Sequence, residues 1–533
     1  DYVIADASEG QVFVAVNHNK NTSHLYISDV NGKKYTLSME RVLLYSPNLQ
    51  QHSWLRRYMT EKFVDLYPVA SMRGVYIASQ LSYGKVGTRK IYTVISYDKG
   101  RFWRNVNVPV RHANGSLVAC ALSSSCSLHL AQRYAQTHPQ YYAPPVMSRT
   151  SAPGLIVSSG NIGKRLSFRS NVYVSNDAGE SWLEVLQGRW FYNFGDHGGV
   201  IVAARQWSAT KELLYSTDEG LTWKRYNFTT KPIHVYGLLT EPGETTTIFT
   251  VFGSYRGHHS WLVVQVNVSN VLGRPCADAD YETWSPHNRG WGYGCILGQR
   301  LEYERRKRNA TCFNGGDYER LINTSVCYCS DQDYECDIGF KPWSRWHFCL
   351  IDHNAGFDPL AAPRKCPAGT TYNETQGYRK IAGDKCSGGG LTWWYDPIKT
   401  SCPFEPDKAF LMYAERSTIQ YVDLTNNNHS TQIEGLRAAV AVAYDMRDDY
   451  IYWADIKDHA IMRRKFNGTD IITIAAVRQV EGLDFDWTTD NLYWVDSVEK
   501  VIEVCRKDGL FRKTLHSSDL HKPRALALDP AMG

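Results

Sequence analysis

Apolar and polar residues alternate in short runs over roughly the first 270 positions of the chain. The runs are rich in Val, Ile, Tyr and Thr, and Gly, Asn, Asp and Ser separate them, a pattern typical of β-strands joined by tight turns. Helical periodicity is weak except near residues 128–136. The segment is therefore predicted to be all-β. Matching apolar strands are expected to begin near Gln11, Gly74, Gly154, Gly199 and Thr247.

The motif Ser-x-Asp-x-Gly-x-x-Trp recurs in this segment at residues 96–103, 175–182 and 216–223. The last two copies start 41 residues apart, which is the length of one four-stranded propeller blade. The longer gap before them contains an insertion at about 107–151 that holds Cys120 and Cys126. The spacing predicts part of a β-propeller with four or five blade units.

The residue types of this motif favour a structural role. Ser and Asp side chains accept hydrogen bonds from turn amides, Gly adopts a positive φ, and Trp packs on the adjoining strands. We therefore do not expect its aspartates to be catalytic.

Residues 276–402 have a different composition, with loops rich in Gly, Asp and Tyr. The absence of Cys-x-x-Cys pairs and of a histidine set argues for disulfides and against zinc, and hence for an oxidising compartment. Ten cysteines allow hundreds of pairings, so spacing alone leaves the connectivity open. The segment contains Cys276, Cys295, Cys312, Cys327, Cys329, Cys336, Cys349, Cys366, Cys386 and Cys402.

N-glycosylation sequons support the same compartment. Nine Asn-x-Ser/Thr sequons occur along the chain, which is more than isolated chance matches would explain. The predicted acceptors are Asn21, Asn114, Asn227, Asn267, Asn309, Asn323, Asn373, Asn428 and Asn467.

A second β repeat begins near Asp407. Tyr-Trp-x-Asp occurs at 452–455 and again 41 residues later at 493–496, each preceded by an apolar strand that ends in an acid. A third such strand is predicted at 525–529. About three blades would leave an open ring with exposed sheet edges, so we expect both ends of this sequence to lie inside domains.

Charge and hydropathy exclude some function classes. The net charge is only +5 and the basic residues are spread along the chain, so nucleic acid is not an expected partner. No apolar run is long enough to span a membrane, so any anchor would lie outside this chain. The basic run 305–308 is either a proprotein-convertase site or a solvated loop.

Parts of this pattern occur in proteins of different function classes. A sialidase-like glycosidase shares the Ser-x-Asp-x-Gly-x-x-Trp turns but needs an arginine cluster with a tyrosine nucleophile, and no such grouping is evident. Other catalytic motifs, metal-ligand clusters and cofactor sites are also absent from the sequence. A secreted or cell-surface adhesion or matrix protein would explain the second repeat. The ten-cysteine segment has no place in the glycosidase interpretation and the first repeat argues against the matrix interpretation, so we do not expect an enzyme.

The order of the three regions resembles the sortilin family of vacuolar-protein-sorting-ten-type receptors. Local runs strengthen the resemblance, at 126–130, 195–199, 236–243 and 377–380. The second repeat is similar to the propeller of the low-density-lipoprotein receptor. It indicates the branch of the sortilin family whose members contain such a second propeller.

The resemblance implies a domain plan. Residues 1–275 would form the C-terminal half of a ten-bladed propeller with a central tunnel. Residues 276–328 and 329–404 would form two cysteine-rich subdomains, and 405–533 would begin a six-bladed Tyr-Trp-x-Asp propeller.

The resemblance also implies a disulfide pattern. Cys120 and Cys126 are expected to close a short loop, and Cys505 is left free or paired outside this chain. The implied pairs in the module are Cys276–Cys312, Cys295–Cys327, Cys329–Cys386, Cys336–Cys349 and Cys366–Cys402.

The implied function is that of the ectodomain of a single-pass sorting and endocytic receptor. It would bind peptide and protein ligands, such as neuropeptides, propeptides and membrane-protein or lipoprotein cargo, by β-strand addition in the tunnel. It would carry them between Golgi, cell surface and endosomes and release them in acid. The family's ligand-anchoring arginine has no counterpart here, and Arg133 is the candidate substitute or else a solvated arginine.

Histidine titrates in the endosomal range. The candidate pH sensors are His129, His138, His197, His258 and His259. His197, beside Asp196 and between glycines, is either such a sensor or a turn histidine with local hydrogen bonds.

Overall fold

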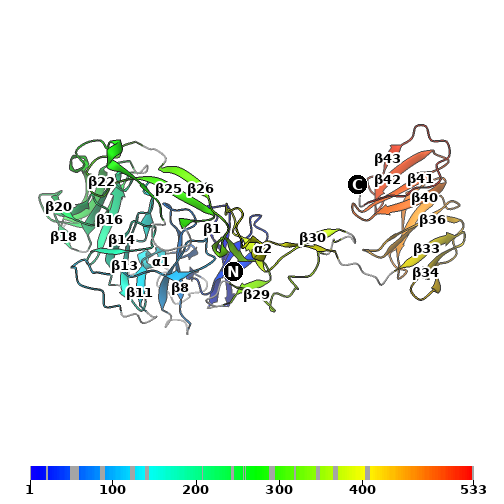
Figure 1. The fold of residues 1–533 in the computed structure, drawn as a ribbon, viewed down its shortest axis with the longest axis horizontal. Coiled ribbons are helices and arrows are strands. Elements are labelled where there is room, and N and C mark those ends of the chain that lie inside the picture. The colour runs from blue at the N-terminus through cyan, green and yellow to red at the C-terminus, as the bar shows by residue number, and fades with distance from the viewer. Residues whose placement is uncertain are drawn as a thin grey trace. The chain divides into compact units, whose positions relative to one another are not determined.

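The computed structural model consists almost entirely of β-strands and turns (Figure 1). The chain divides into two compact units, Asp1–Arg364 with Thr371–Thr400, and Lys365–Thr370 with Ser401–Gly533, which are described separately. The residues that the structure describes are 2–19, 22–47, 59–83, 90–120, 126–137, 143–167, 169–206, 208–241, 245–255, 257, 260–286, 294–316, 320–343, 348–363, 366, 370–402 and 409–530.

Five antiparallel sheets, numbered 1 to 5 here, follow one another in the described part of residues 2–267. Sheet 1 contains β1 (Tyr2–Asp6), β2 (Phe13–Asn19), β3 (Thr22–Ser28) and β4 (Tyr35–Met39). Sheet 2 contains β7 (Leu66–Pro68), β8 (Tyr76–Leu81), β9 (Ile91–Ser96) and β10 (Arg104–Asn105). Sheet 3 contains β11 (Ser127–Leu130), β12 (Met147–Ser148), β13 (Ile156–Gly163), β14 (Asn171–Ser175) and β15 (Leu183–Leu186).

Sheets 4 and 5 complete the series. Sheet 4 contains β16 (Trp190–Gly195), β17 (Val200–Arg205), β19 (Glu212–Ser216) and β20 (Lys224–Asn227). Sheet 5 contains β18 (Ala209–Thr210), β21 (Ile233–Thr240), β22 (Ile248–Tyr255) and β23 (Trp261–Asn267). A short ladder joins β5 (Leu44–Tyr45) to β6 (Phe63–Val64). The all-β prediction is confirmed, and the five predicted apolar strands are β2, β8, β13, β17 and β22.

Apolar side chains fill the spaces between successive sheets. Phe13 of sheet 1 packs with Tyr76 of sheet 2, and Ile77 of sheet 2 packs with Ile156 of sheet 3. The same face-to-face packing continues from sheet 3 to sheet 4 and from sheet 4 to sheet 5. Burial of both faces explains why the central strands are nearly continuous apolar runs rather than strictly alternating ones. The region near 128–136, the part of this segment with helical periodicity in its sequence, forms β11 and then a single helical turn, α1 (Arg133–Thr137).

Each Ser-x-Asp-x-Gly-x-x-Trp motif forms the turn between the third and fourth strands of its sheet. In the copy that starts at Ser175, the serine hydroxyl donates to Asp177 and accepts from the Gly179 amide, both at 2.8 Å. Asp177 Oδ1 also accepts from the Ser181 amide at 2.8 Å. The other two copies make the same bonds. The structural interpretation of the motif is confirmed.

The residue between Asp and Gly in each motif is left-handed, at Lys99, Ala178 and Glu219 (φ 53°, 59° and 58°). The cysteine-rich module, residues 276–402, contacts the propeller sheets through two of these residues. Lys99 Nζ donates to the Ala382 carbonyl of the module at 2.8 Å, and Glu219 pairs with Arg305 of the module. The glycine that follows each of these residues also has a positive φ, a backbone conformation that is strained for residues with a side chain.

The module is built from small ladders and disulfides. Its strands are β24 (Tyr281–Trp284), β25 (Gln299–Arg306), β26 (Leu321–Val326), β27 (Tyr334–Cys336), β28 (Phe340–Pro342), β29 (Cys349–Ile351), β30 (Thr371–Glu374), β31 (Tyr378–Lys380) and β32 (Ile398–Ser401), with one short helix α2 (Thr392–Tyr395). The disulfides join Cys120 to Cys126, Cys276 to Cys312, Cys295 to Cys327, Cys329 to Cys386, Cys336 to Cys349 and Cys366 to Cys402. These are the pairs that the resemblance implies.

The second unit contains three sheets among its described residues. Its strands are β33 (Phe410–Glu415), β34 (Thr418–Asp423), β35 (Asn428–Ile433), β36 (Ala439–Asp445), β37 (Tyr450–Asp455), β38 (Ala460–Lys465), β39 (Ile472–Ala476), β40 (Val480–Asp486), β41 (Asn491–Asp496), β42 (Val501–Arg506) and β43 (Lys513–His516). Cys505 is a buried free thiol, and burial raises its pKa to about 11.

The prediction of a strand at 525–529 is wrong. This segment contacts β40, where the Leu528 amide donates to Asp484 Oδ2 at 2.8 Å, but it forms no ladder in the described residues. The Leu528 amide thus bonds to a side-chain carboxylate and not to the backbone carbonyl of a neighbouring strand, which a ladder requires. Among the described residues, no helix is long and apolar enough to cross a membrane.

Candidate ligand-binding site

A hollow of about 400 Å³ lies where sheets 1 and 2 meet. Its walls come from β1, the segment 62–67, the start of α1, and Pro145 and Val146. In the described residues β1 forms a ladder with β2 on one side only, and Ile4, which lines the hollow, is 60% exposed. The hollow therefore combines an open strand edge with apolar side chains, the two features that accept an extended peptide.

Arg133, the predicted ligand-binding candidate, lies in the wall of this hollow at the first position of α1. Its guanidinium stacks 4.7 Å from the Phe63 ring centre and lies 3.3 Å from the Glu61 carboxylate. The side chain is 46% exposed, so the group is positioned by contacts on one face and open to solvent on the other. A guanidinium held in this way can accept a carboxylate in place of Glu61.

Asp65, which the sequence analysis did not select, is buried in the same wall between β6 and β7. Its Oδ1 accepts a hydrogen bond from the Tyr134 amide of α1 at 2.9 Å. Burial raises the pKa of Asp65 to about 7, although the Tyr134 amide, Ser79 and the charge of Arg133 act in the opposite direction. The signal in the sequence was an acid inside the apolar run 63–67, where alternation predicts a buried position.

His129, a predicted pH sensor, is completely buried in β11. One ring nitrogen, Nδ1, accepts from the Thr93 amide at 3.2 Å, and Nε2 lies 3.0 Å from the Gly163 carbonyl. Burial lowers the pKa of His129 to about 4. A pKa below the endosomal range does not favour a sensing role for His129, and this role stays a prediction.

His197 lies at the boundary between sheet 4 and the cysteine-rich module. It follows β16 in a short 3₁₀ turn, Asp196–Gly198, in which Asp196 and His197 are both left-handed. Its Nε2 lies 3.2 Å from the carbonyl of Gly315, which is 118 residues away in the chain. The role of His197 as a sensor stays a prediction. His138, His258 and His259 lie outside the described residues.

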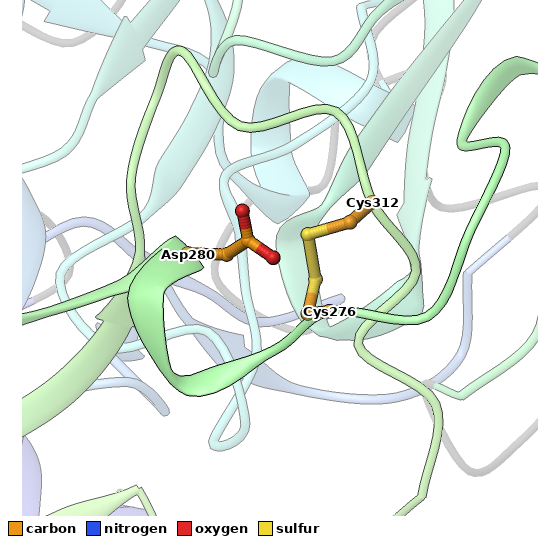
Figure 2. A group of neighbouring side chains, drawn as sticks. All are labelled: Cys276, Asp280 and Cys312. Carbon is orange, nitrogen blue, oxygen red and sulfur yellow. A yellow bond between two sulfur atoms is a disulfide. The ribbon is translucent and has the colours of Figure 1, made fainter.

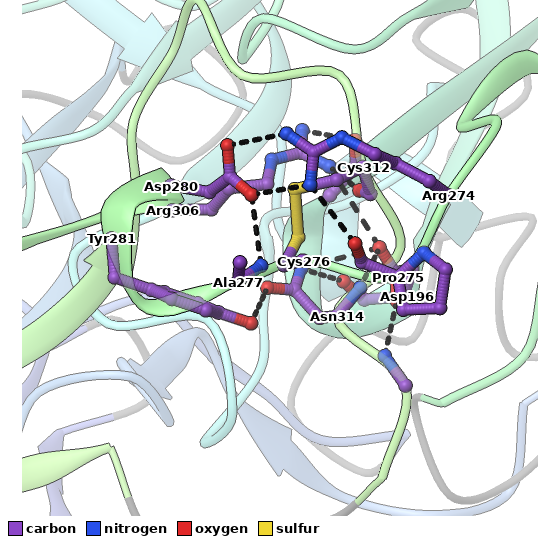
Figure 3. Close-up of a disulfide and its surroundings, with 12 residues drawn as sticks. Asp196, Arg274, Pro275, Cys276, Ala277, Asp280, Tyr281, Arg306, Cys312 and Asn314 are labelled. Atoms are coloured by element: carbon purple, nitrogen blue, oxygen red, sulfur yellow. Dashed lines mark hydrogen bonds and ion pairs between the residues drawn. A yellow bond between two sulfur atoms is a disulfide. The ribbon is translucent and has the colours of Figure 1, made fainter.

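Asp196 connects the propeller sheets to the module (Figure 3). Its carboxylate is buried and accepts from the amides of Asn314 and Gly315, each at 3.1 Å. Burial raises the pKa of Asp196, and these amides, Arg306 and His197 oppose the increase. The backbone around Asn314 is held by the Cys276–Cys312 disulfide, which lies beside it in Figure 3.

The first half of the basic run 305–308 is part of the same boundary, because Arg305 and Arg306 end β25, and Lys307 and Arg308 follow it into a turn. Arg305 donates to the Asn176 carbonyl at 2.8 Å and Arg306 to the Thr217 carbonyl at 2.6 Å, two equivalent positions in successive motif turns. Both arginine side chains are buried. This burial contradicts the convertase-site interpretation, because a protease needs an exposed and extended backbone.

Two groups of acids and cysteines in the described residues lie close enough to suggest metal ligands. Figure 2 shows one of them, Cys276, Asp280 and Cys312. Its two sulfurs form a disulfide, and Asp280 pairs with Arg274 at 2.6 Å, which together with the Ala277 amide lowers the pKa of Asp280 to about 2. Since disulfide sulfurs are not thiolates, this group has no ligand set for zinc.

The predicted glycan acceptors all lie on the surface where they are described. These are Asn114, Asn227, Asn267, Asn309, Asn323, Asn373, Asn428 and Asn467, and each side chain is exposed. Asn21 lies outside the described residues. Exposure is required for glycan attachment, and whether glycans are present stays a prediction.

Family comparisons agree with this architecture. The model of the sortilin (neurotensin receptor 3) Vps10 domain matches residues 1–238, and that of the sortilin C-terminal region matches 240–402. The low-density lipoprotein receptor class B repeat matches 490–530.

Individual proteins match over much of the chain. The mouse sortilin-related receptor is 44% identical over 475 residues, which is 88% of this chain and 21% of that protein. Human SorCS2, a receptor that contains a VPS10 domain, is 34% identical over 76% of this chain and 34% of that protein. A solved structure of the Niastella koreensis GH74 enzyme aligns with 96% of this chain and 71% of the enzyme chain, at 10% identity and a TM-score of 0.24. This similarity is too low to support any argument about function.

This chain spans about a fifth of the length of the sortilin-related receptors it matches. The mouse sortilin-related receptor and human SorCS2 are receptors, in agreement with the prediction that the chain is not an enzyme. From its Vps10-type propeller sheets, its disulfide-rich module and its class B repeat, we conclude that the chain belongs to the sortilin family of receptors and represents part of an ectodomain similar to that of the sortilin-related receptor SorLA.

Proposed function

We propose that this chain contributes a peptide-binding site to a sorting receptor, in which an extended ligand adds to the open edge of β1. The observation that carries the proposal is the hollow that combines this edge with the half-exposed Arg133. Backbone hydrogen bonds to β1 would supply affinity, and the apolar wall with Arg133 would select a ligand that carries a carboxylate. The partners are peptides and proteins on the lumenal side of Golgi, cell surface and endosomes.

Acid release is part of the proposal, and Asp65 takes the role for which His129 is a candidate by residue type. Between neutral pH and about pH 5.5, Asp65 takes up a proton because its pKa lies at about 7. We infer that the ligand-bound position of Arg133 depends on the hydrogen bond that the Tyr134 amide donates to ionised Asp65, so that proton uptake opposes ligand binding. Affinity for ligand is therefore expected to fall in acid.

The test measures binding of an extended-peptide library to the complete ectodomain at about pH 7.4 and about pH 5.5. Arg133→Ala should lower the affinity for carboxylate-bearing peptides about tenfold, which is equivalent to about 1.4 kcal/mol of binding free energy. Arg225→Ala, which removes a 76% exposed arginine on β20, is the control and should leave affinity unchanged. Peptides N-methylated at alternate residues should lose binding because they lack the donors needed for strand addition.

Asp65→Asn should reduce the affinity difference between the two pH values, whereas His129→Gln should preserve it. Equal affinity of the wild type at both pH values would refute acid release. Peptides that fail to bind at either pH would reject the peptide-binding site and favour an adhesion protein.

A further inference from the structure

Buried carboxylates gather where the cysteine-rich module meets sheets 1 and 2. Glu335 of β27 is 3% exposed, and Asp333, two residues earlier, is 5% exposed. The carboxylates of Asp333 and Asp384 face one another, with atoms within 4.8 Å. Since two carboxylates at this separation repel one another when both are ionised, one proton shared between them is favoured.

The propeller sheets supply the cations that face this group. Lys99, whose side chain is completely buried in the first motif turn, interacts with Glu9, Glu335 and Asp384. Arg101 of the same turn faces Glu335, as does the acid Asp98. Arg73 faces Lys99 and Glu9, and Asp6 also faces Glu9.

The module supplies two further cations. Arg379 of β31 lies opposite Glu335 in the ladder, donates to Glu335 Oε1 at 2.8 Å and donates to Thr36 of sheet 1 at 3.0 Å. Lys380 faces Asp384. Glu335 and Arg379 thus lie at the contact between module and propeller sheets, not in the interior of the module alone.

Two oxygens in this group lack hydrogen-bond partners. Glu335 Oε2 and Asp384 Oδ2 are buried, and neither receives a hydrogen bond from the described residues. An ionised carboxylate in such a position loses its hydration without full compensation, whereas a protonated carboxyl group loses much less. The arrangement is therefore more favourable for neutral acids than for two or three buried anions.

We propose that this boundary is a proton-operated clamp, in which proton uptake by Glu335 and by the Asp333–Asp384 pair holds the module more tightly against the propeller sheets in acid than at neutral pH. The clamp does not depend on where ligands bind. It would give the receptor a stiffer junction in acidic compartments and a looser one at the cell surface.

The direction follows from proton linkage. Burial raises the pKa of Glu335 and of Asp384 to about 7, against 4.5 and 3.8 for the free groups. If the groups regain water when the module separates from the propeller sheets, the docked state binds more protons than the separated state at pH values between the free and the docked pKa. Docking is therefore favoured as pH falls through this range. For one group with the values of Glu335, the docking equilibrium changes by up to about twentyfold between about pH 7.4 and about pH 5.5.

Hydrogen exchange of the complete ectodomain at the two pH values, corrected for intrinsic exchange rates, tests the clamp. Peptides that cover 330–338 and 377–388 should be at least about fivefold more protected in acid. Glu335→Gln and Asp384→Asn should bring the protection at neutral pH close to the acid level and reduce the ratio below about twofold. Protection of β37 provides an internal reference within the same sample.

Glu282→Gln is the matched control, because Glu282 is an exposed carboxylate on β24 of the same module. It should keep the wild-type ratio. Protection that falls or stays constant on acidification of the wild type would overturn the clamp, and so would a full ratio in Glu335→Gln. The wild-type titration, with a midpoint expected near pH 7, decides the question even where a variant does not fold.

Discussion

The two repeats of this protein both begin a turn with an aspartate, but the aspartates connect different parts of the structure. In sheets 2, 3 and 4 the aspartate closes the turn between the third and fourth strands, as Asp177 does with Ser175 and Ser181. In the second unit Asp455 is the last residue of the second strand, β37, and accepts from the Arg437 and Ala438 amides just before the first strand, β36. The first arrangement is local, and the second ties one end of the sheet together.

The difference determines which residues are free to make other contacts. In the propeller sheets the local turn leaves a left-handed residue that contacts the module, as Lys99 and Glu219 do. In the second unit the aspartate itself makes the longer connection, and left-handed residues such as Lys500 are exposed. A repeat can therefore stabilise each sheet alone or also provide a docking surface, according to where its turn lies.

The largest expected effect is from Asp455→Ala. Asp455 accepts from four backbone amides, those of Arg437, Ala438, Lys457 and Asp458, at 2.8–3.2 Å, and is buried. Its loss leaves these amides unsatisfied, so we expect about 3 kcal/mol lower stability of the second unit. Chemical denaturation that follows the tryptophans of this unit measures it. A loss under about 0.5 kcal/mol would mean that water replaces the carboxylate.

Asp177→Ala should lower the stability of the first unit by a smaller amount, about 1–2 kcal/mol. Asp177 accepts from one backbone amide, that of Ser181, and its other donors are the Ser175 and Ser181 hydroxyl groups, which can rotate to bind water instead. The measurement is denaturation of the first unit. Asp358→Ala, which changes an exposed aspartate of the module, is the control. If Asp177→Ala costs as much as Asp455→Ala, the contrast between local and long-range turns fails.

Glu219→Ala should reduce protection at the junction rather than the stability of sheet 4. Glu219 pairs with Arg305 and Arg308, and since Arg305 keeps its hydrogen bond to the Asn176 carbonyl when Glu219 is removed, we expect a contribution of about 1 kcal/mol. Hydrogen exchange across β25 is the measurement. Lys500→Ala, at an equivalent left-handed but exposed position, should change protection of its own unit by less than about twofold. Equal effects of the two changes would show that docking does not distinguish the repeats.

The sequence by itself determined the features that depend on neighbours in the chain. Strand periodicity, the 41-residue spacing and the turn chemistry of Ser175 and Asp177 are local, since each side chain acts within a few residues, and the structure confirms them. The family followed from the order of such local motifs. The predicted strand at 525–529 failed because a strand also needs a partner.

Only the tertiary structure decided which charged and titratable groups are buried and what they face. His129 has the residue type of a pH sensor, but burial in β11 holds its pKa at about 4. Asp65 and Glu335 have ordinary carboxyl groups in the sequence, and burial among distant segments raises their pKa values to about 7. The run 305–308 appeared solvated until β25 placed two of its arginines against turns 89 and 129 residues away. Desolvation depends on everything that surrounds a group, and these surroundings come from parts of the chain whose contacts no local pattern encodes.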